Sequence, residues 1–194
     1  KDLGQISALF ESCDLLLFSQ PLYKYSGIPY YLDEIEILVG KAYQMGLEIC
    51  IKLHPRDDIS VYRPITQGKC RLIKHRNDWT VEESICLIQN SKVVIGKGST
   101  SLILPLLMQK PVMCLDLYDS DIVHFKYHFD LKLLLKDIKD FEYLYTFATD
   151  PEKHSFIQDQ QNQLLGRLGY FDGLSWKRIR NEIDKYLKNL DRWE

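Results

Sequence analysis

The segment Ile49-Cys50-Ile51-Lys52-Leu53-His54-Pro55-Arg56 is the clearest architectural signal in the sequence. The apolar residues at its start indicate a buried parallel strand, because such a strand is covered on both faces. Pro55 favours extended geometry at His54 and lacks the N–H group that further strand pairing would use. His54 is therefore predicted at the carboxyl end of a strand, where open α/β sheets bind their ligands. The cationic side chains around it favour an anionic ligand, and a polar strand end without function is the alternative.

Apolar runs alternate with helical periodicity along the rest of the chain, which predicts a parallel sheet with right-handed crossovers. Strands are expected at 15–18, 49–51, 71–73, 92–96 and 112–117, and helices at 33–45, 81–89 and 101–108. Residues 57–69 are expected to form an irregular connection. Beyond Asp119 the pattern weakens, apart from a closing helix over 175–190 on which Trp176 shares a face with aliphatic residues. The expected fold is one Rossmann-like α/β domain over residues 1–194, with 119–194 its least defined part.

Length and composition fit one globular domain. The chain has 194 residues, of which 45% are hydrophobic and 27% charged, enough to build a single core. Its formal net charge of −2 argues against a nucleic-acid partner held by bulk electrostatics. No apolar run approaches the roughly 20 residues that span a bilayer. The sequence begins at Lys1 without a signal-peptide pattern, which is compatible with a fragment of a longer protein.

The five cysteines form no CxxC pair and lie mostly within apolar runs. Buried free thiols in a reducing compartment are therefore expected, rather than disulfides or zinc ligands. No carboxylate cluster has metal-ligand spacing either. These observations predict a cytoplasmic protein that needs neither a metal nor another cofactor.

A second motif, Ile95-Gly96-Lys97-Gly98-Ser99-Thr100-Ser101, lies between a predicted strand and a predicted helix. Glycines allow the backbone to approach a ligand, and the exposed amides and dipole of a helix N-terminus favour anions. The spacing is not that of a P-loop, and the third glycine of GxGxxG is missing. We predict that Gly98, Ser99, Thr100 and Ser101 bind phosphate, with plain helix capping as the alternative.

Taken together, these segments resemble the C-terminal, nucleotide-binding half of a GT-B glycosyltransferase, and most of all bacterial sialyltransferases and polysialyltransferases. The resemblance covers residues 12–118 and rests on Phe18-Ser19-Gln20-Pro21-Leu22, Lys52-Leu53-His54-Pro55, Gly98-Ser99-Thr100-Ser101 and Leu106-Leu107-Met108-Gln109-Lys110-Pro111-Val112. In those enzymes a His-Pro motif contacts the nucleotide and a Ser-Ser/Thr motif holds its phosphate. The resemblance implies inverting, metal-independent transfer of sialic acid from CMP-sialic acid to a surface glycan such as lipooligosaccharide or capsule.

The resemblance and the local chemistry assign roles to the predicted site residues. His54, protonated beside the phosphate, would act as general acid toward the leaving group. Lys52 and Pro55 belong to the nucleotide-contacting motif. The candidate general base is Asp33, with Glu34 as the alternative, although carboxylates in the first turn of a helix also stabilise its dipole without any catalysis.

Further residues complete the predicted site. His75, after the third predicted strand, is expected to seat the base, with an ordinary polar loop as the alternative. Tyr118, at the end of the fifth strand, is expected to line the nucleotide pocket. Asp57 and Asp58 are expected to form a solvated turn after the histidine.

Two other functions stay open at this point. One is a different GT-B transferase with a CDP-linked donor, such as the polyol-phosphate polymerases of teichoic acid synthesis. The other is a non-catalytic nucleotide-binding module. As an enzyme, the protein would have a nucleotide-linked donor and a glycan acceptor as partners. Such an acceptor is made at the inner face of the bacterial membrane, which implies peripheral association there, and a homodimer is also open.

Overall fold

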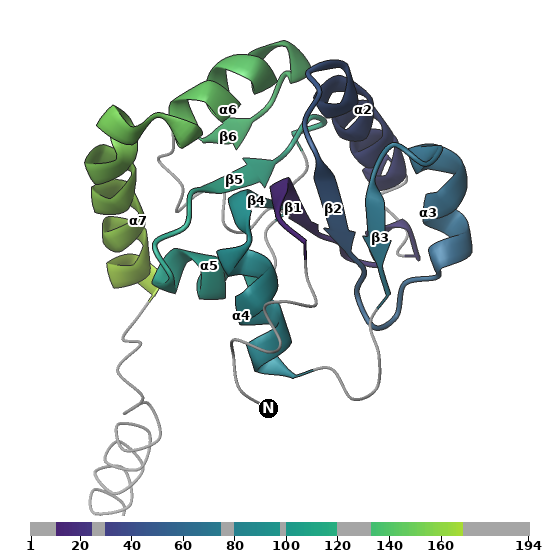
Figure 1. Ribbon diagram of the computed structural model, residues 1–194, viewed down its shortest axis with the longest axis horizontal. Helices are drawn as coiled ribbons and strands as arrows, with labels where there is room; N and C mark the ends of the chain where they lie inside the picture. The colour runs from purple at the N-terminus through teal and green to yellow at the C-terminus, as the bar shows by residue number, and fades with distance from the viewer. Residues whose placement is uncertain (1–10, 25–29, 75–79, 98–99, 120–132, 169–194) are drawn as a thin grey trace, which may run out of the picture.

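The computed structural model describes residues 11–24, 30–74, 80–97, 100–119 and 133–168 (Figure 1). They contain a six-stranded sheet of order β3-β2-β1-β4-β5-β6, in which every neighbouring pair is parallel. The strands are β1 (Cys13–Phe18), β2 (Ile49–Lys52), β3 (Arg71–Ile73), β4 (Ser91–Gly96), β5 (Val112–Leu115) and β6 (Leu134–Leu135). The chain runs outward from β1 to β3 and then crosses back to β4, so the strand order reverses between β1 and β4. The predicted Rossmann-like fold class is confirmed.

Helices cover both faces of the sheet. They are α2 (Tyr31–Gln44), α3 (Ile59–Thr66), α4 (Val81–Gln89), α5 (Ile103–Leu107), α6 (Phe141–Thr149) and α7 (His154–Leu168). One core cluster joins the sheet to α2, α3 and α6, and a second joins its other face to α4 and α5 (Figure 1). Helix α7 contributes Ile157 to the first cluster and Leu164 to the second.

The apolar residues of strand β1 explain its place in the centre of the sheet. Leu15 and Leu17 face the first core cluster, while Leu16 and Phe18 face the second. Alternate side chains of a strand point to opposite faces, so a strand covered on both sides must be apolar at every position. The register aligns Phe18 with Lys52 of β2, and the strands therefore end together at one edge of the sheet. We call this the carboxyl edge, and the opposite one the amino edge.

Two expectations about secondary structure are wrong. Residues 57–69 contain α3, because the side chain of Asp58 accepts a hydrogen bond from the backbone N–H of Ser60 and so caps a helix. Tyr62 and Thr66, one turn apart, are buried on its inner side. The region after Asp119 also contributes β6, α6 and α7 to the domain. The expected helix over 175–190, with Trp176, lies outside the described residues, and the extent of one domain over 1–194 stays a prediction.

All five thiols are free, and four of them are buried, whereas the reducing compartment stays a prediction. Among the described residues, no helix has both the length and the apolar composition to cross a bilayer.

Candidate functional site

A hydrogen-bond network centred on Asp57 fixes the loop after β2. One carboxylate oxygen of Asp57, Oδ2, accepts hydrogen bonds from the hydroxyl of Ser19, which directly follows β1, and from the hydroxyl of Tyr62 in α3 at 3.0 Å. The backbone N–H of His54 lies 2.9 Å from Ser19 Oγ and 3.2 Å from Asp57 Oδ2. The His54 backbone is thus held to β1 and α3. The expected solvated turn is wrong for Asp57, whereas Asp58 is exposed and caps α3.

The imidazole of His54 is held as one tautomer. The backbone N–H of Arg56 donates to His54 Nδ1 at 3.0 Å, so Nδ1 is an acceptor and the ring proton lies on Nε2. A neutral imidazole in this state presents Nε2–H as a hydrogen-bond donor to an anion. Transfer of a proton from His54 would require the imidazolium, and a protonated Nδ1 could no longer accept from Arg56. The geometry therefore provides a fixed donor, while the role of general acid stays a prediction.

Lys52, the last residue of β2, adds positive charge beside this histidine. It aligns with Phe18 and Ile73 and shares their face of the sheet, the one that α4 and α5 cover. Its side chain is only 8% exposed. Burial lowers the pKa of Lys52, and the negative charge of Asp57 acts in the opposite direction. A bound anion would favour the charged form of this lysine.

The predicted phosphate loop follows β4 at the same edge. Gly98 and Ser99 lie outside the described residues, as does His75 after β3. Thr100 opens a 3-10 turn that leads into α5, and Ser101 is half-buried there. A Cβ atom at Gly96 would lie 3.0 Å from Leu102 Cδ2, so glycine permits this turn to pack closely against the end of β4. Phosphate binding by these residues stays a prediction.

The sequence analysis missed the most buried polar feature of the carboxyl edge. Lys97, directly after β4, has its ammonium group 2.5 Å from both carboxylate oxygens of Glu34 and 3.7 Å from Asp116 Oδ1. The side chains of Lys97, Glu34 and Asp116 are 1%, 0% and 0% exposed. We call these three residues the Lys97 triad. The sequence places Lys97 in a loop between glycines and gives no sign of the long-range pairing.

The two predicted bases differ in accessibility. Asp33 is exposed in the first turn of α2, whereas the next residue, Glu34, points inward to Lys97. Burial raises the pKa of Glu34, although the ion pair with Lys97 and the backbone N–H of Tyr118 oppose the shift. Only Asp33 is open to an acceptor hydroxyl from solvent. Its role as general base stays a prediction, and the geometry of Glu34 is that of a structural ion pair.

Tyr118 lies beyond the end of β5, with its ring exposed. It packs against the ring of Tyr30, which precedes α2, with a centroid distance of 5.1 Å and an interplanar angle of 34°. Tyr30 and Tyr118 are 54% and 45% exposed. We call them the tyrosine pair. Pro55 is exposed at the same edge, after the histidine. A nucleotide-lining role for Tyr118 and a nucleotide-contacting role for Pro55 stay predictions.

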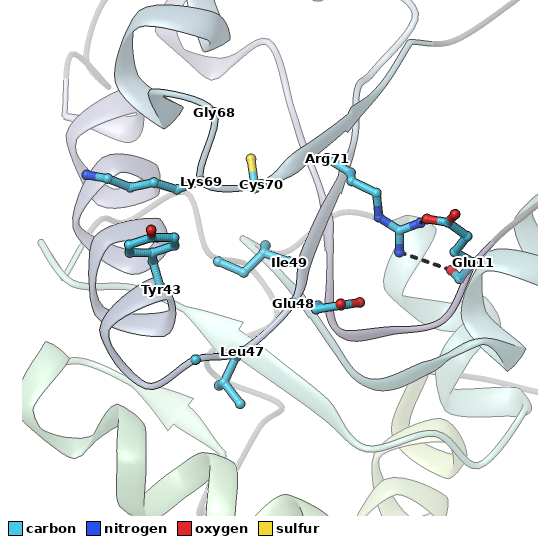
Figure 2. Close-up of a pocket in the computed structure, with 10 residues that line it drawn as sticks. Glu11, Tyr43, Leu47, Glu48, Ile49, Gly68, Lys69, Cys70 and Arg71 are labelled. Atoms are coloured by element: carbon cyan, nitrogen blue, oxygen red, sulfur yellow. Dashed lines mark hydrogen bonds and ion pairs between the residues drawn. The ribbon is translucent and has the colours of Figure 1, made fainter.

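A large cavity lies at the amino edge instead, with a volume of about 620 Å³. Figure 2 shows Tyr43, Lys69, Cys70 and Arg71 around it. The Arg71 guanidinium is already occupied by the carboxylate of Glu11 at 2.9 Å and by backbone carbonyls (Figure 2). Burial raises the pKa of the Cys70 thiol to about 11, which makes it a weak nucleophile. The guanidinium group of Arg71 is therefore already paired, and Cys70 offers no activated thiol to a ligand in this cavity.

Within the described residues, no group of three or more histidine, cysteine, aspartate or glutamate side chains has the geometry of a metal site.

Comparison with known proteins identifies the fold and nothing finer. No protein-family model and no curated protein matches the sequence. The structure is similar to S. aureus MnaA in a co-structure with UDP, with a TM-score of 0.61 and 14% sequence identity over 97% of this chain and 49% of that chain. It is also similar to the UDP-GlcNAc 2-epimerase from Neisseria meningitidis bound to UDP-GlcNAc, with a TM-score of 0.55 and 13% identity over 85% and 48% of the two chains. The chain has the GT-B Rossmann-like fold.

A third similar structure is the wall teichoic acid polymerase TagF with CDPG, which has a TM-score of 0.51 and 17% identity over 97% of this chain and 46% of that chain. This chain therefore spans about half the length of each of the three. By their descriptions, one of the three is a structure with UDP, one is a UDP-GlcNAc 2-epimerase and one is a wall teichoic acid polymerase. None of these three structures is described as a sialyltransferase.

Proposed function

We propose that this chain is the donor-binding half of a GT-B transferase that uses a cytidine nucleotide-linked donor. The observation that carries the proposal is His54, whose Nε2–H is held as a donor at the carboxyl end of β2 by the Arg56 and Asp57 contacts. This position adjoins β1, where the strand order begins to reverse and open α/β sheets bind their ligands. The fold similarity to one structure with UDP and another with UDP-GlcNAc supports a nucleotide as the ligand.

The arrangement can stabilise a departing phosphate. His54 Nε2–H would donate to a phosphate oxygen, and Lys52 would supply positive charge from the same strand. Thr100 and Ser101 would contribute hydroxyl groups from the next crossover. Donors that are fixed before the reaction need no reorganisation as negative charge develops on the leaving group. Asp33 would accept the proton of the incoming acceptor hydroxyl.

Transfer of sialic acid from CMP-sialic acid to a surface glycan is the specific reaction we propose. The order of the His-Pro and Ser-Thr motifs supports it. Transfer from a CDP-linked polyol is the second candidate, which the fold similarity to TagF with CDPG favours. A membrane-bound acceptor would place the enzyme at the inner face of a bacterial membrane, peripherally attached, either alone or as a homodimer.

Calorimetric titration with CMP, CDP and UDP tests the proposal. We expect CMP and CDP to bind, and His54→Ala to weaken binding at least about tenfold, because a hydrogen bond to a charged group contributes about 1.5–3 kcal/mol. The matched control is His154→Ala, since His154 is an exposed histidine of α7 that contacts Gln158. If the unmodified chain binds no nucleotide, the proposal is wrong.

A donor panel on the enzyme expressed from its full reading frame separates the candidate reactions. Turnover of CMP-sialic acid would establish the sialyl reaction, and turnover of CDP-glycerol or CDP-ribitol the polyol reaction. Nucleotide binding without turnover of any donor would indicate a non-catalytic module.

A further inference from the structure

The Lys97 triad connects three separate crossovers at the carboxyl edge. Glu34 belongs to the first turn of α2 after β1, Lys97 follows β4, and Asp116 follows β5. Lys97 lies between the two carboxylates, with both carboxylate oxygens of Glu34 at 2.5 Å. One buried ammonium group thus ties together loops that come from different parts of the sequence.

The tyrosine pair is attached directly to this triad. The backbone N–H of Tyr118 donates to the carboxylate of Glu34. The backbone N–H of Glu34 donates to the carbonyl oxygen of Tyr30 at 3.0 Å. Asp116 also precedes Tyr118 by two residues. The triad therefore holds the backbone of Tyr118 through the Glu34 carboxylate, and Tyr30 is fixed beside it by the backbone of α2, to which Glu34 also belongs.

Burying three charges is an expensive way to hold a fold together. The desolvation cost of a buried ion pair can exceed its Coulombic gain, and apolar residues of similar volume often give equal or greater stability. The cores on both sides of this sheet are apolar, so aliphatic side chains would have suited the position of the triad. A directional contact to the backbone N–H of Tyr118 is what an aliphatic side chain at the position of Glu34 could not provide.

We propose that the tyrosine pair is a stacking surface for a ring of the nucleotide-linked donor, and that the Lys97 triad holds it in position. This inference rests on the proposed function. Aromatic side chains bind ring ligands through their faces, and stacking tolerates either a base or a sugar with exposed C–H groups. The charged pair Lys136 and Asp119, 3.7 Å apart, adjoins the tyrosines. Charged residues are depleted in the cores of protein interfaces, so this surface suits a polar ligand better than a protein partner.

Variants of Tyr118 test the stacking surface. Tyr118→Ala should weaken binding of the donor about tenfold, in the range found when a stacked aromatic is removed, whereas Tyr118→Phe keeps the ring and should bind almost normally. The control is Tyr43→Ala, because Tyr43 is an exposed tyrosine near the other end of α2. Titration with CMP and with CMP-sialic acid identifies the ring. If Tyr118→Ala loses affinity for both ligands, the stacked ring is the base. If it loses affinity for CMP-sialic acid alone, the stacked ring is the sugar.

A charge-free triad tests the positioning role. The triple variant Lys97→Met, Glu34→Leu, Asp116→Val replaces all three charges by apolar side chains of roughly similar volume, so it should fold about as stably as the original. We expect the Tyr118 amide to exchange with solvent faster in it, and donor affinity to fall by a factor similar to that of Tyr118→Ala. Lys92→Met is the control, because Lys92 is an exposed lysine at the amino end of β4 that also pairs with a carboxylate, that of Asp14.

The outcomes separate this inference from the proposed function. If the unmodified chain binds no cytidine nucleotide, the proposed function fails. If it binds and Tyr118→Ala binds equally well, the stacking surface is wrong. If the triple variant folds with unchanged affinity and unchanged exchange at Tyr118, the positioning role is wrong. Should the triple variant not fold, exchange of the Tyr118 amide in the unmodified protein decides: slowing upon addition of CMP-sialic acid, which carries both rings, supports the inference, and no change overturns it.

Discussion

The two edges of one sheet are built differently. The amino edge has a cavity of about 620 Å³ and ion pairs that reach the solvent, such as that of the exposed Lys92 with the partly buried Asp14. The carboxyl edge instead contains the fully buried Lys97 triad and the Asp57 network beneath His54. Buried charges are costly, so residues that retain them mark a place where position matters more than stability. In this protein the arrangement of buried polar groups indicates the candidate site better than cavity size does.

The largest effect is expected from breaking the triad on one side only. Lys97→Met leaves two carboxylates buried without their cation, and removal of one partner of a buried ion pair costs about 3–5 kcal/mol of unfolding free energy. Lys92→Met, at the amino end of β4, removes an ion pair between an exposed lysine and the partly buried Asp14, and should cost about 1 kcal/mol. Urea unfolding of both variants measures the difference. If the two variants lost equal unfolding free energy, burial of the charges would not distinguish the two edges.

A second comparison lies within the carboxyl edge, between neighbouring aspartates. Asp57→Ala leaves the buried Tyr62 hydroxyl and the Ser19 hydroxyl without their acceptor, which should cost about 2 kcal/mol and also weaken CMP binding. Asp58→Ala removes only the cap of α3, at about 1 kcal/mol. Urea unfolding and CMP titration measure both variants. If Asp58→Ala lost as much CMP affinity as Asp57→Ala, the proposed contribution of the Asp57 network to nucleotide binding would be wrong.

The pH dependence of stability should have opposite signs at the two edges. Burial raises the pKa of Glu34 above its ordinary value of 4.5, so the folded state holds the proton more tightly and stability falls as pH rises above 4.5. Burial of Asp14 raises its pKa, but the contacts with Lys92 and with the backbone of Glu48 outweigh burial and lower the pKa below its ordinary value of 3.8. The folded state therefore loses stability as the pH falls below 3.8.

Unfolding free energies measured from pH 2 to pH 7 test these signs. Glu34→Gln should remove the decrease on the alkaline side of 4.5, and Asp14→Asn should remove the decrease on the acid side of 3.8. Unchanged pH profiles in both variants would refute the assignment.

The smallest effect is expected at the amino-edge cavity. Arg71→Met removes the ion pair with Glu11, whose carboxylate is largely exposed, and should change stability by about 1 kcal/mol or less. CMP affinity should stay the same, because Arg71 lies at the start of β3 and not at its carboxyl end. A clear loss of CMP affinity would move the candidate site to the amino edge.

Much of the architecture could be predicted from the sequence. Runs such as Leu15-Leu16-Leu17-Phe18 and Ile49-Cys50-Ile51 indicate doubly covered strands, since apolar periodicity is a local property. The helix α3 was missed because its signal is a short cap at Asp58 followed by an interior proline, Pro64. The helix α7 was missed because its glutamine-rich sequence carries weak periodicity. The helix α6 was missed although Phe141, Leu144, Tyr145 and Ala148 share a buried face at helical spacing.

The sequence by itself determined the fold class and the placement of His54 at a strand end, because both follow from residues close together in the chain. Only the tertiary structure decided which polar groups meet. Glu34 and Lys97 are 63 residues apart, and Ser19 and Asp57 are 38 apart. Such pairs form only when crossovers bring different strand ends to one edge, so no local pattern encodes them. These long-range contacts form the two polar networks of the candidate site. Asp57, which was expected in a solvated turn, accepts hydrogen bonds from Ser19 and Tyr62, and Lys97, for which the sequence suggested no role, is buried between two carboxylates.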